Sequence, residues 1–391
     1  MSNFVDFQNE IYLGGLEGVV PELPMSASGL EARAARELDP AAFAYVAGSA
    51  SAERTAAENA AAFDRYRILP RMLRGTTGAG ARDLSVEVLG TRLAAPVLTA
   101  PIGALELVHE AGEVLAAGVT AELGIGSVLS TVASSTIEEV GAAAGQWWYQ
   151  LYWPADDDLA RSFIGRAERA GAKALVVTVD TPHLGWRPRD LELAHLPFLH
   201  GKGIVNYLSD PVFRDRLAAA PEESPEAMRA AIRTWFGLFG NHALRPADLG
   251  RLREWTDLPI AVKGVLHPDD ARQVVDAGAD AVVVSNHGGR QVDGSVAALH
   301  ALPAVVATVG DRADVLFDSG VRTGSDMLIA LALGAKAVMY GRPWVYGLGI
   351  AGRAGLRHAL RMLLADFDSV LGLSGCASPD ELSRSLIVGP R

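Results

Sequence analysis

The sequence predicts a (β/α)8 barrel, the architecture also called a TIM barrel. Strand-like runs recur along the chain from residue 95 onwards, and helix-like segments lie between them. There are eight such runs, which is the number that this barrel requires. Most are continuous apolar runs rather than alternating ones, as expected for parallel strands buried on both faces. A doubly wound parallel sheet is the alternative that the same order of elements allows.

The eight expected strands are short and regularly spaced. Three of the segments between them have helical character, and the first of these begins with aspartates and ends with glycine, as capped helices do. These helices are expected at 156–171, 267–278 and 324–334. The strands are expected at APVLTAPIG (95–103), IGSVLST (125–131), QWWYQLYW (146–153), ALVVTVD (174–180), LPIAVKGV (258–265), DAVVVSNHG (280–288), ADVLFDSGV (313–321) and AKAVMYGRP (335–343).

Two segments lie outside this repeat. Residues 1–94 form an N-terminal extension that includes the helix-like stretch GLEARAARELDPAAFAYVAG. Residues 190–250, between the fourth and fifth strands, exceed an ordinary βα loop and are rich in apolar and aromatic residues, which favours a packed lid over a disordered loop. With the barrel at 95–391, we expect a single domain that spans residues 1–391.

Composition limits the class of protein. The net charge of −11 disfavours binding to nucleic acid or to an anionic membrane surface. The single cysteine, Cys376, allows no disulfide within the chain and suits a cytoplasmic location. The start MSNFVDFQNEIYLGG does not resemble a signal peptide, no apolar run is long enough to span a membrane, and no metal site is expected.

Polar and glycine residues close the expected strands. The stretch SNHGGRQVDG (285–294) places an imidazole, His287, three residues before the guanidinium of Arg290. Taken alone, these could be a turn histidine and a solvated charge. In a (β/α)8 barrel, however, the C-terminal ends of all strands meet at one rim, which holds the active site. We therefore predict one site from the strand-end residues Pro101–Gly103, Ser130, Thr131, Gln150, Tyr152, Thr178, Asp180, Lys263, Ser285, His287, Arg290, Asp318, Arg322, Gly341 and Arg342.

The last two strand ends indicate a phosphate-bearing ligand. DSGVRTG follows the seventh strand and YGRP the eighth, which brings glycines and two arginines together. Glycines let backbone N–H groups approach an anion, and arginine binds phosphate in a fork. No G-x-G-x-x-G follows the first strand, so a Rossmann dinucleotide site is unsupported. The phosphate itself could belong to a sugar phosphate, a nucleotide, pyridoxal phosphate or flavin mononucleotide.

The motifs SNHGGRQ, KGV, DSGVRTG with GRP, YQLYW and TVDTP together resemble the FMN-dependent α-hydroxy-acid oxidases. The resemblance covers nearly the whole chain, and the motifs occur in the order found in that family. Within the family, LGWRPRDL, LPFL, DPVF, NEIY and the chain length are most similar to the lactate 2-monooxygenase group. The resemblance implies bound FMN.

It also implies a role for each matching residue. His287 matches the histidine that takes the proton of the hydroxy acid, and Asp180 matches the carboxylate near it. Substrate contacts are implied for Tyr45, Tyr152, Arg187 and Arg290. Flavin-ring and ribityl contacts are implied for Pro101, Ile102, Gly103, Ser130, Gln150, Thr178 and Ser285, with Lys263 beside the N1/O2 edge of the ring. The ribityl phosphate is implied to bind at Asp318, Ser319, Gly320, Val321, Arg322, Gly341 and Arg342.

The chemistry suits these residue types. Arginine can hold a carboxylate in a fork, histidine titrates near neutral pH, and an adjacent carboxylate stabilises the imidazolium. Lys263 would offset the negative charge of a reduced flavin. Gly103 is small where a substrate side chain would approach.

The implied reaction is L-lactate with O₂ to acetate, CO₂ and water. One alternative is an oxidase or dehydrogenase that releases the 2-keto acid, with H₂O₂ as the other product of the oxidase. Another is a phosphate-binding barrel without redox chemistry, such as an isomerase. A homotetramer or a higher homo-oligomer is expected.

Overall fold

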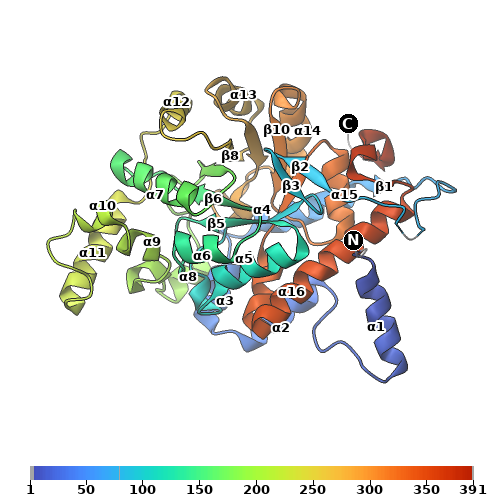
Figure 1. The fold of residues 1–391 in the computed structure, drawn as a ribbon, viewed down its shortest axis with the longest axis horizontal. Helices are drawn as coiled ribbons and strands as arrows, with labels where there is room; N and C mark the ends of the chain where they lie inside the picture. Colours follow the sequence, from blue (N-terminus) through green and yellow to red (C-terminus); the bar gives the residue numbers. More distant parts are fainter. Residues whose placement is uncertain (1–3, 79, 390–391) are drawn as a thin grey trace.

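The computed structural model describes residues 4–78 and 80–389, and eight parallel strands at its centre close into a barrel (Figure 1). The strand order is β10-β11-β4-β5-β6-β7-β8-β9, so the last strand of the series pairs with the first. This closure confirms the predicted (β/α)8 barrel and excludes the doubly wound sheet. All eight expected strands form, as β4 (Val97–Thr99), β5 (Gly126–Ser130), β6 (Trp147–Leu151), β7 (Leu175–Thr178), β8 (Ile260–Val265), β9 (Ala281–Val284), β10 (Asp314–Asp318) and β11 (Ala337–Tyr340).

The barrel interior is packed with side chains rather than open. Alternate strand residues point inward, including Leu98, Trp148, Val283 and Met339, and all four are fully or almost fully buried. A hairpin from the N-terminal extension, β2 (Val86–Val88) and β3 (Thr91–Leu93), joins this cluster. This hairpin was not predicted from the sequence, because its two strands are only three residues long.

A ring of helices covers the outside of the barrel (Figure 1). Helices form at all three expected positions, as α7, α13 and α15. All three have an N-cap side chain that accepts a backbone N–H from the first turn: Asp156 for α7, His267 for α13 and Thr323 for α15. The ring is α5 (Gly112–Leu123), α6 (Ile137–Ala143), α7 (Asp157–Arg169), α12 (Leu249–Arg253), α13 (Pro268–Asp276), α14 (Ala298–Val309), α15 (Gly324–Ala332) and α16 (Arg342–Leu373).

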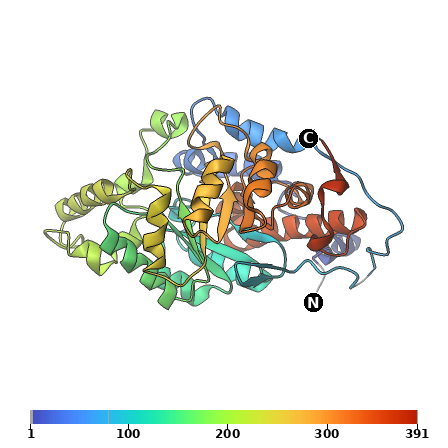
Figure 2. The ribbon, with the colours of Figure 1, turned by 90° about the horizontal axis from the view of Figure 1, so that it is seen from above.

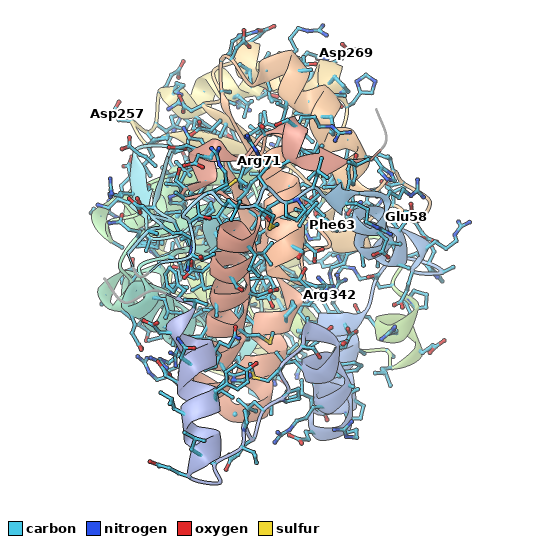
Figure 3. The ribbon with its side chains drawn as sticks, turned by 90° about the vertical axis from the view of Figure 1, so that its right-hand side faces the viewer. Glu58, Phe63, Arg71, Asp257, Asp269 and Arg342 are labelled. Carbon is cyan, nitrogen blue, oxygen red and sulfur yellow. The ribbon has the colours of Figure 1, made fainter. Side chains whose placement is uncertain are left out.

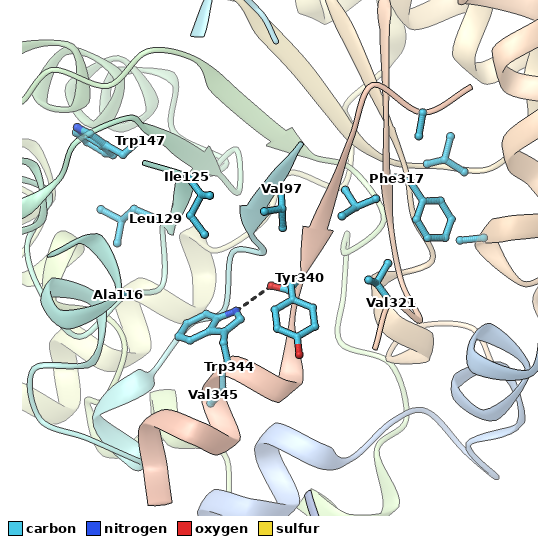
Figure 4. Close-up of a cluster of buried hydrophobic side chains, with 14 of the residues drawn as sticks. Val97, Ala116, Ile125, Leu129, Trp147, Phe317, Val321, Tyr340, Trp344 and Val345 are labelled. Carbon is cyan, nitrogen blue, oxygen red and sulfur yellow. Dashed lines mark hydrogen bonds between the residues drawn. The ribbon is translucent and has the colours of Figure 1, made fainter. Parts of the chain in front are cut away.

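The main core lies between the barrel and these helices. Figure 4 shows Trp344 of α16 beside Tyr340 of β11, with the Trp344 indole N–H donating to the Tyr340 carbonyl at 2.9 Å. Outward residues of the first three barrel strands, such as Val97, Leu129 and Trp147, belong to the same cluster. This packing fixes the start of α16, and with it Gly341 and Arg342, at the rim of the barrel.

The N-terminal extension packs against the rim of the barrel and against α16. Its helices are α1 (Asp6–Leu16), α2 (Ala27–Glu37), α3 (Pro40–Ala47) and α4 (Arg54–Ala61). The helical stretch expected around residues 29–48 is split in two because Asp39 caps α3 and Pro40 begins it. A short strand after α4, β1 (Arg67–Ile68), pairs with β12 (Ile387–Val388) near the end of the chain.

Residues 190–250 are ordered into short helices that form one end of the elongated molecule (Figures 1 and 2). Their packing depends on large buried side chains: Phe198, Tyr207, Phe213 and Trp235 are at most 4% exposed. The helices of this region are α8 (Pro188–Glu192), α9 (Val205–Leu208), α10 (Pro211–Arg214) and α11 (Pro225–Leu238), with short 3-10 turns at Pro197–His200 and Pro246–Asp248.

Over residues 4–78 and 80–389, no helix combines the length and the apolar character needed to cross a membrane.

Candidate active site

One cavity of about 1030 Å³, including the space at its open mouth, lies at the C-terminal ends of the barrel strands. Of the residues predicted for the site from the family resemblance, all but four line it. The four that do not are Ser130, Gln150, Asp180 and Ser285. The predicted residues that line it are Tyr45, Pro101, Ile102, Gly103, Tyr152, Thr178, Arg187, Lys263, His287, Arg290, Asp318, Ser319, Gly320, Val321, Arg322, Gly341 and Arg342.

His287 stands at the first position of a 3-10 turn, His287–Gly289, that follows β9. Its φ is 58°, a left-handed conformation that non-glycine residues seldom adopt and that recurs at functional sites. The turn is held by Asn286, whose side chain accepts from the Gly289 N–H at 3.1 Å. Gly289 is required here, because a Cβ would lie 2.6 Å from the backbone nitrogen of Ala56.

His287 and Asp180 form a partly buried pair. His287 Nδ1 lies 2.8 Å from Asp180 Oδ1, and the Thr181 hydroxyl donates to the same oxygen at 3.0 Å. With the proton on Nδ1 donated to the carboxylate, Nε2 carries the free lone pair. Nε2 lies 3.5 Å from the Tyr152 hydroxyl. This arrangement leaves an imidazole nitrogen available as a base beside the cavity.

In this pair Asp180 is charged and His287 is neutral. Burial lowers the pKa of His287, and although Asp180 opposes this, Lys263 and Arg187 add to the lowering. Burial by itself raises the pKa of Asp180, but His287 and Lys263 outweigh it and the net pKa is lowered. At neutral pH the site therefore holds a neutral imidazole next to a carboxylate.

Lys263 provides a fixed cation on the floor of the site. Its Nζ lies 3.0 Å from Asp318 Oδ2 and 3.1 Å from the Ser285 hydroxyl. Burial lowers the pKa of Lys263, but the nearby Asp318 and Asp180 more than compensate, so the pKa is raised and the amine stays protonated. Burial raises the pKa of Asp318, but Lys263 reverses this and keeps it ionised.

Two arginines approach the cavity from different loops. Arg187 is 7% exposed, and burial together with the charge of Arg290 lowers its pKa to about 10, so it remains charged at neutral pH. Arg290 Nη1 donates to the carbonyls of Tyr45 at 2.8 Å and Gly48 at 2.6 Å, and its guanidinium lies 5.3 Å from the Tyr45 ring centroid. The two cations can bind an anionic group of a ligand.

The predicted phosphate end of the cavity holds Arg322, Arg342 and the glycine residues, and Arg342 lies near Arg290, because both donate to the Gly48 carbonyl. Arg342, labelled in Figure 3, lies where the N-terminal helices meet the start of α16, and it donates to the carbonyls of Val46, Gly48 and Gly288 and to the Ser49 hydroxyl. Its guanidinium is thus already bonded to the protein, whereas Arg322 makes one side-chain hydrogen bond, to the Val321 carbonyl. Arg322 therefore has more free N–H donors for a phosphate than Arg342 has.

The residues fit an FMN molecule. Gln150 Oε1 accepts from the Ser130 hydroxyl at 3.1 Å and the Thr131 N–H at 3.2 Å, and its buried Nε2 has no partner within residues 4–78 and 80–389. The buried hydroxyl of Thr178 also lacks a partner. Buried polar atoms are nearly always bonded, so both point to a missing ligand with ring carbonyl and nitrogen atoms. At the phosphate end, a Cβ on Gly341 would meet no atom closer than 3.9 Å, which leaves room for a ligand against the backbone.

Some residues of the cavity wall were not foreseen from the sequence. Thr181 could have been predicted, because it follows Asp180 directly. Phe239 could not, because it closes a helix within the 190–250 insertion, 41 residues after Phe198, yet both phenylalanines line the cavity. The other such wall residues are Val46, Ala100, Val132, Leu184, Gly288 and Met339.

Gly103 lines the cavity, and its small size is required by the neighbouring backbone. A Cβ at this position would lie 2.5 Å from the Val132 carbonyl oxygen and 2.6 Å from its Cγ2. Glycine is required there because the two backbone segments approach closely. Val132 lines the cavity as well.

Comparison with known proteins agrees with this site. Residues 34–389 match the model of the FMN-dependent dehydrogenase family. The chain is 39% identical to the FMN-dependent alpha-hydroxy acid dehydrogenase qulF of Penicillium citrinum, over 98% of this chain and 95% of that protein. It is 35% identical to an L-lactate oxidase of Lysinibacillus sphaericus, over 99% and 98%. A crystal structure of mandelate oxidase with benzoyl-formic acid matches with a TM-score of 0.79 and 34% identity, over 92% and 97%. The chain therefore belongs to the FMN-dependent dehydrogenase family and is an FMN-dependent oxidoreductase of 2-hydroxy acids.

Proposed function

We propose that His287 is the base of this enzyme and that Arg187 and Arg290 hold the carboxylate of an L-2-hydroxy acid. The observation that carries the proposal is the His287 imidazole, whose Nδ1 lies 2.8 Å from Asp180 Oδ1, in the same cavity as the two arginines. A base and a carboxylate clamp are what the oxidation of a 2-hydroxy acid requires from the protein.

FMN, when bound, takes up the electron pair that leaves the α carbon. The other steps belong to the side chains. Arg187, Arg290 and the Tyr45 hydroxyl orient the substrate carboxylate, and Tyr152 contacts the α-hydroxyl next to His287 Nε2. His287 accepts the proton from the substrate, and Asp180 stabilises the imidazolium that results. Lys263 stabilises negative charge that develops on the cofactor side.

The residues that would hold FMN form two groups, one at the strand ends and one at the predicted phosphate end. Thr178 and Gln150 supply the unpartnered polar atoms at the strand ends, and Arg322 supplies free donors for the phosphate. The remaining proposed contacts are Pro101, Ile102, Gly103, Ser130, Lys263, Ser285, Asp318, Ser319, Gly320, Val321, Gly341 and Arg342.

More specifically, we propose that the substrate is L-lactate and that the products are acetate, CO₂ and water. The keto acid and peroxide must then meet before either leaves. Phe198 and Phe239 of the 190–250 insertion line the cavity and support such retention. Release of the 2-keto acid with H₂O₂ is the second candidate, and the relatives named L-lactate oxidase favour it.

Product analysis separates the two candidates. The holoenzyme is mixed with L-lactate, first without oxygen, to follow loss of flavin absorbance, and then in air, to quantify acetate, pyruvate and H₂O₂. We expect rapid bleaching and mostly acetate. Pyruvate and peroxide in equal amounts would show that the enzyme is an oxidase and not a monooxygenase. If no 2-hydroxy acid bleaches the flavin, the proposal as a whole is overturned.

We also propose a homotetramer or a higher homo-oligomer in the cytoplasm. Exposed apolar side chains on and after α1, with Tyr12, Leu13, Leu16, Val19 and Val20 each more than 60% exposed, support self-association. The single cysteine supports a reducing compartment. Light scattering after size-exclusion chromatography tests the first statement, and cell fractionation tests the second.

A further inference from the structure

The positive charges of Arg187 and Arg290 have no carboxylate partner among the described residues. Every hydrogen-bond acceptor that the structure gives to their side chains is neutral: the carbonyls of Tyr45 and Gly48 for Arg290, and the Arg290 carbonyl and the Gln291 amide for Arg187. Asp190 lies close enough to raise the pKa of Arg187 but forms no ion pair with it. The charge of this pair is therefore available to a ligand.

Gln291 is the side chain that keeps Arg187 in place without neutralising it. Its Oε1 accepts from Arg187 Nη2 at 3.1 Å and from the Gly185 N–H at 3.2 Å. Its Nε2 donates to the carbonyls of Asp180 at 3.0 Å and His183 at 2.8 Å. Two donors stand on one side of the amide and two acceptors on the other, so a flipped amide would lose all four bonds.

These four bonds join the turn after β9 to the loop after β7. That loop carries Asp180, the partner of His287, and Arg187, while the turn carries His287 and Arg290. The loop also approaches the turn closely, because a Cβ on Gly185 would lie 2.5 Å from the Arg290 carbonyl oxygen. Gln291 thus reaches both halves of the proposed machinery through one neutral group.

We propose that Gln291 is a positioning residue whose neutrality sets the preference of this site for anionic substrates. A carboxylate at this position would meet the charge of Arg187 and compete with the carboxylate of the substrate. An amide holds Arg187 in the same place and leaves the charge free. The inference rests on the proposed function, in which Arg187 and Arg290 bind the substrate carboxylate.

Two variants separate charge from geometry. Gln291→Glu keeps the shape and the acceptor towards Arg187 but adds a negative charge. Gln291→Met keeps the length and has neither charge nor amide. Both lose the donor to the Asp180 and His183 carbonyls, so the fall in kcat that they share measures positioning. Gln273→Glu, on the exposed face of α13, adds the same charge away from the cavity and serves as the control.

The measurement is the ratio of kcat/KM for L-lactate to that for the neutral L-lactamide, with calorimetric binding of oxalate to the holoenzyme as a readout that needs no turnover. For Gln291→Glu we expect the ratio to fall and oxalate binding to weaken by about tenfold or more. For Gln291→Met we expect kcat/KM to fall for both substrates with the ratio within about twofold of wild type. Gln273→Glu should match wild type in every measurement.

A Gln291→Glu enzyme that keeps the wild-type ratio and the wild-type affinity for oxalate would overturn the inference. If this variant loads FMN poorly, oxalate binding is followed by the flavin absorbance, which reports only on the loaded fraction. If the wild-type enzyme itself fails to prefer L-lactate over L-lactamide, then the proposed carboxylate clamp is wrong, and that failure is distinct from a failure of the role of Gln291.

Discussion

The side chain of His287 combines a rare backbone conformation with a neutral imidazole. Its left-handed φ of 58° directs the ring towards Asp180, and burial keeps its pKa below the ordinary value. The hydrogen bonds that hold the Arg342 guanidinium do not involve the imidazole ring. The proposed base can therefore be removed without removing the groups that would bind FMN.

We expect His287→Gln to slow flavin reduction by about 10² to 10⁴-fold, because glutamine cannot accept the substrate proton. FMN should remain bound at the wild-type ratio. Anaerobic stopped-flow absorbance with L-lactate measures the rate, and the ratio of flavin to protein absorbance serves as the control. Reduction at near the wild-type rate would show that another group is the base.

The pH dependence of reduction follows from the same pair. Only the neutral imidazole can act as a base, and the pKa of His287 is lowered, so the rate should be level at neutral pH and fall with a midpoint below the ordinary histidine pKa of about 6.5. Asp180→Asn removes the charge that favours imidazolium. We expect it to move the acid limb to still lower pH and to reduce the level rate by about 10²-fold. An acid limb that moves to higher pH in this variant would contradict the assigned role of Asp180.

Helix α4, in the N-terminal extension, supports the turn His287–Gly289. The side-chain amides of Asn59 and Asn286 bond to each other at 2.8 and 2.7 Å, and both residues are buried. Asp293, seven residues after Asn286, accepts from the backbone N–H groups of Ala52 and Thr55. The extension is therefore part of the framework that holds His287 in its left-handed conformation.

The 190–250 insertion has an anchored base and an aromatic inner edge. At its base, Asp210 is fully buried and lies 3.1 Å from Arg166 of α7. At its inner edge, Phe198 and Phe239 both pack against Trp235, with ring centroids 5.2 and 5.1 Å apart. Removing residues 202–222 would delete the buried Tyr207 and Phe213, so changes at the inner edge test the proposed lid more sharply than a deletion.

Phe198→Leu should loosen this edge at a cost of about 1 kcal/mol in the free energy of unfolding. If the insertion retains the keto acid, the share of pyruvate and H₂O₂ should rise about several-fold at the expense of acetate, with anaerobic flavin reduction largely preserved. Phe236→Leu, at an exposed position of α11, is the matched control. An unchanged product ratio in an active, flavin-loaded Phe198→Leu enzyme would show that the insertion does not control which products are released.

At the scale of the whole molecule, the cavity crosses the rim of the barrel and is lined by residues from the N-terminal extension, the strand ends and the insertion. A ligand that fills it contacts all three. The buried Gln150 Nε2 and Thr178 hydroxyl have no partner among the described residues, and we expect such a ligand to supply one. Ligand binding should therefore stabilise the fold as a unit.

We expect FMN to raise the melting temperature of the apoprotein, because a ligand at 100 times its Kd stabilises the folded state by about 2.7 kcal/mol. Thermal unfolding with and without added FMN measures this, and riboflavin, which lacks the phosphate, is the control that reports on the Arg322 end of the cavity. Chromatography of the denatured holoenzyme should release FMN. Recovery of FAD, or a melting temperature that FMN leaves unchanged, would contradict the site described above.

By itself, the sequence determined the barrel and the rim. Runs such as AVVV at 281–284 are apolar enough to be buried on both faces, and eight of them in series have one common closed arrangement. Because parallel strands in this barrel all end at the same rim, the sequence alone predicts that His287, Arg290, Lys263 and Asp318 meet there.

Tertiary structure decided the contacts that no local pattern encodes. The Asn59–Asn286 pair joins residues 227 positions apart, and the bond between Gln291 and Arg187 joins residues 104 positions apart. The need for glycine at position 103 is hidden from the sequence for the same reason, because the atoms that exclude its Cβ belong to Val132, just after the next barrel strand. Periodicity and caps report on neighbours along the chain, whereas these contacts depend on how barrel closure brings loops from different strands together.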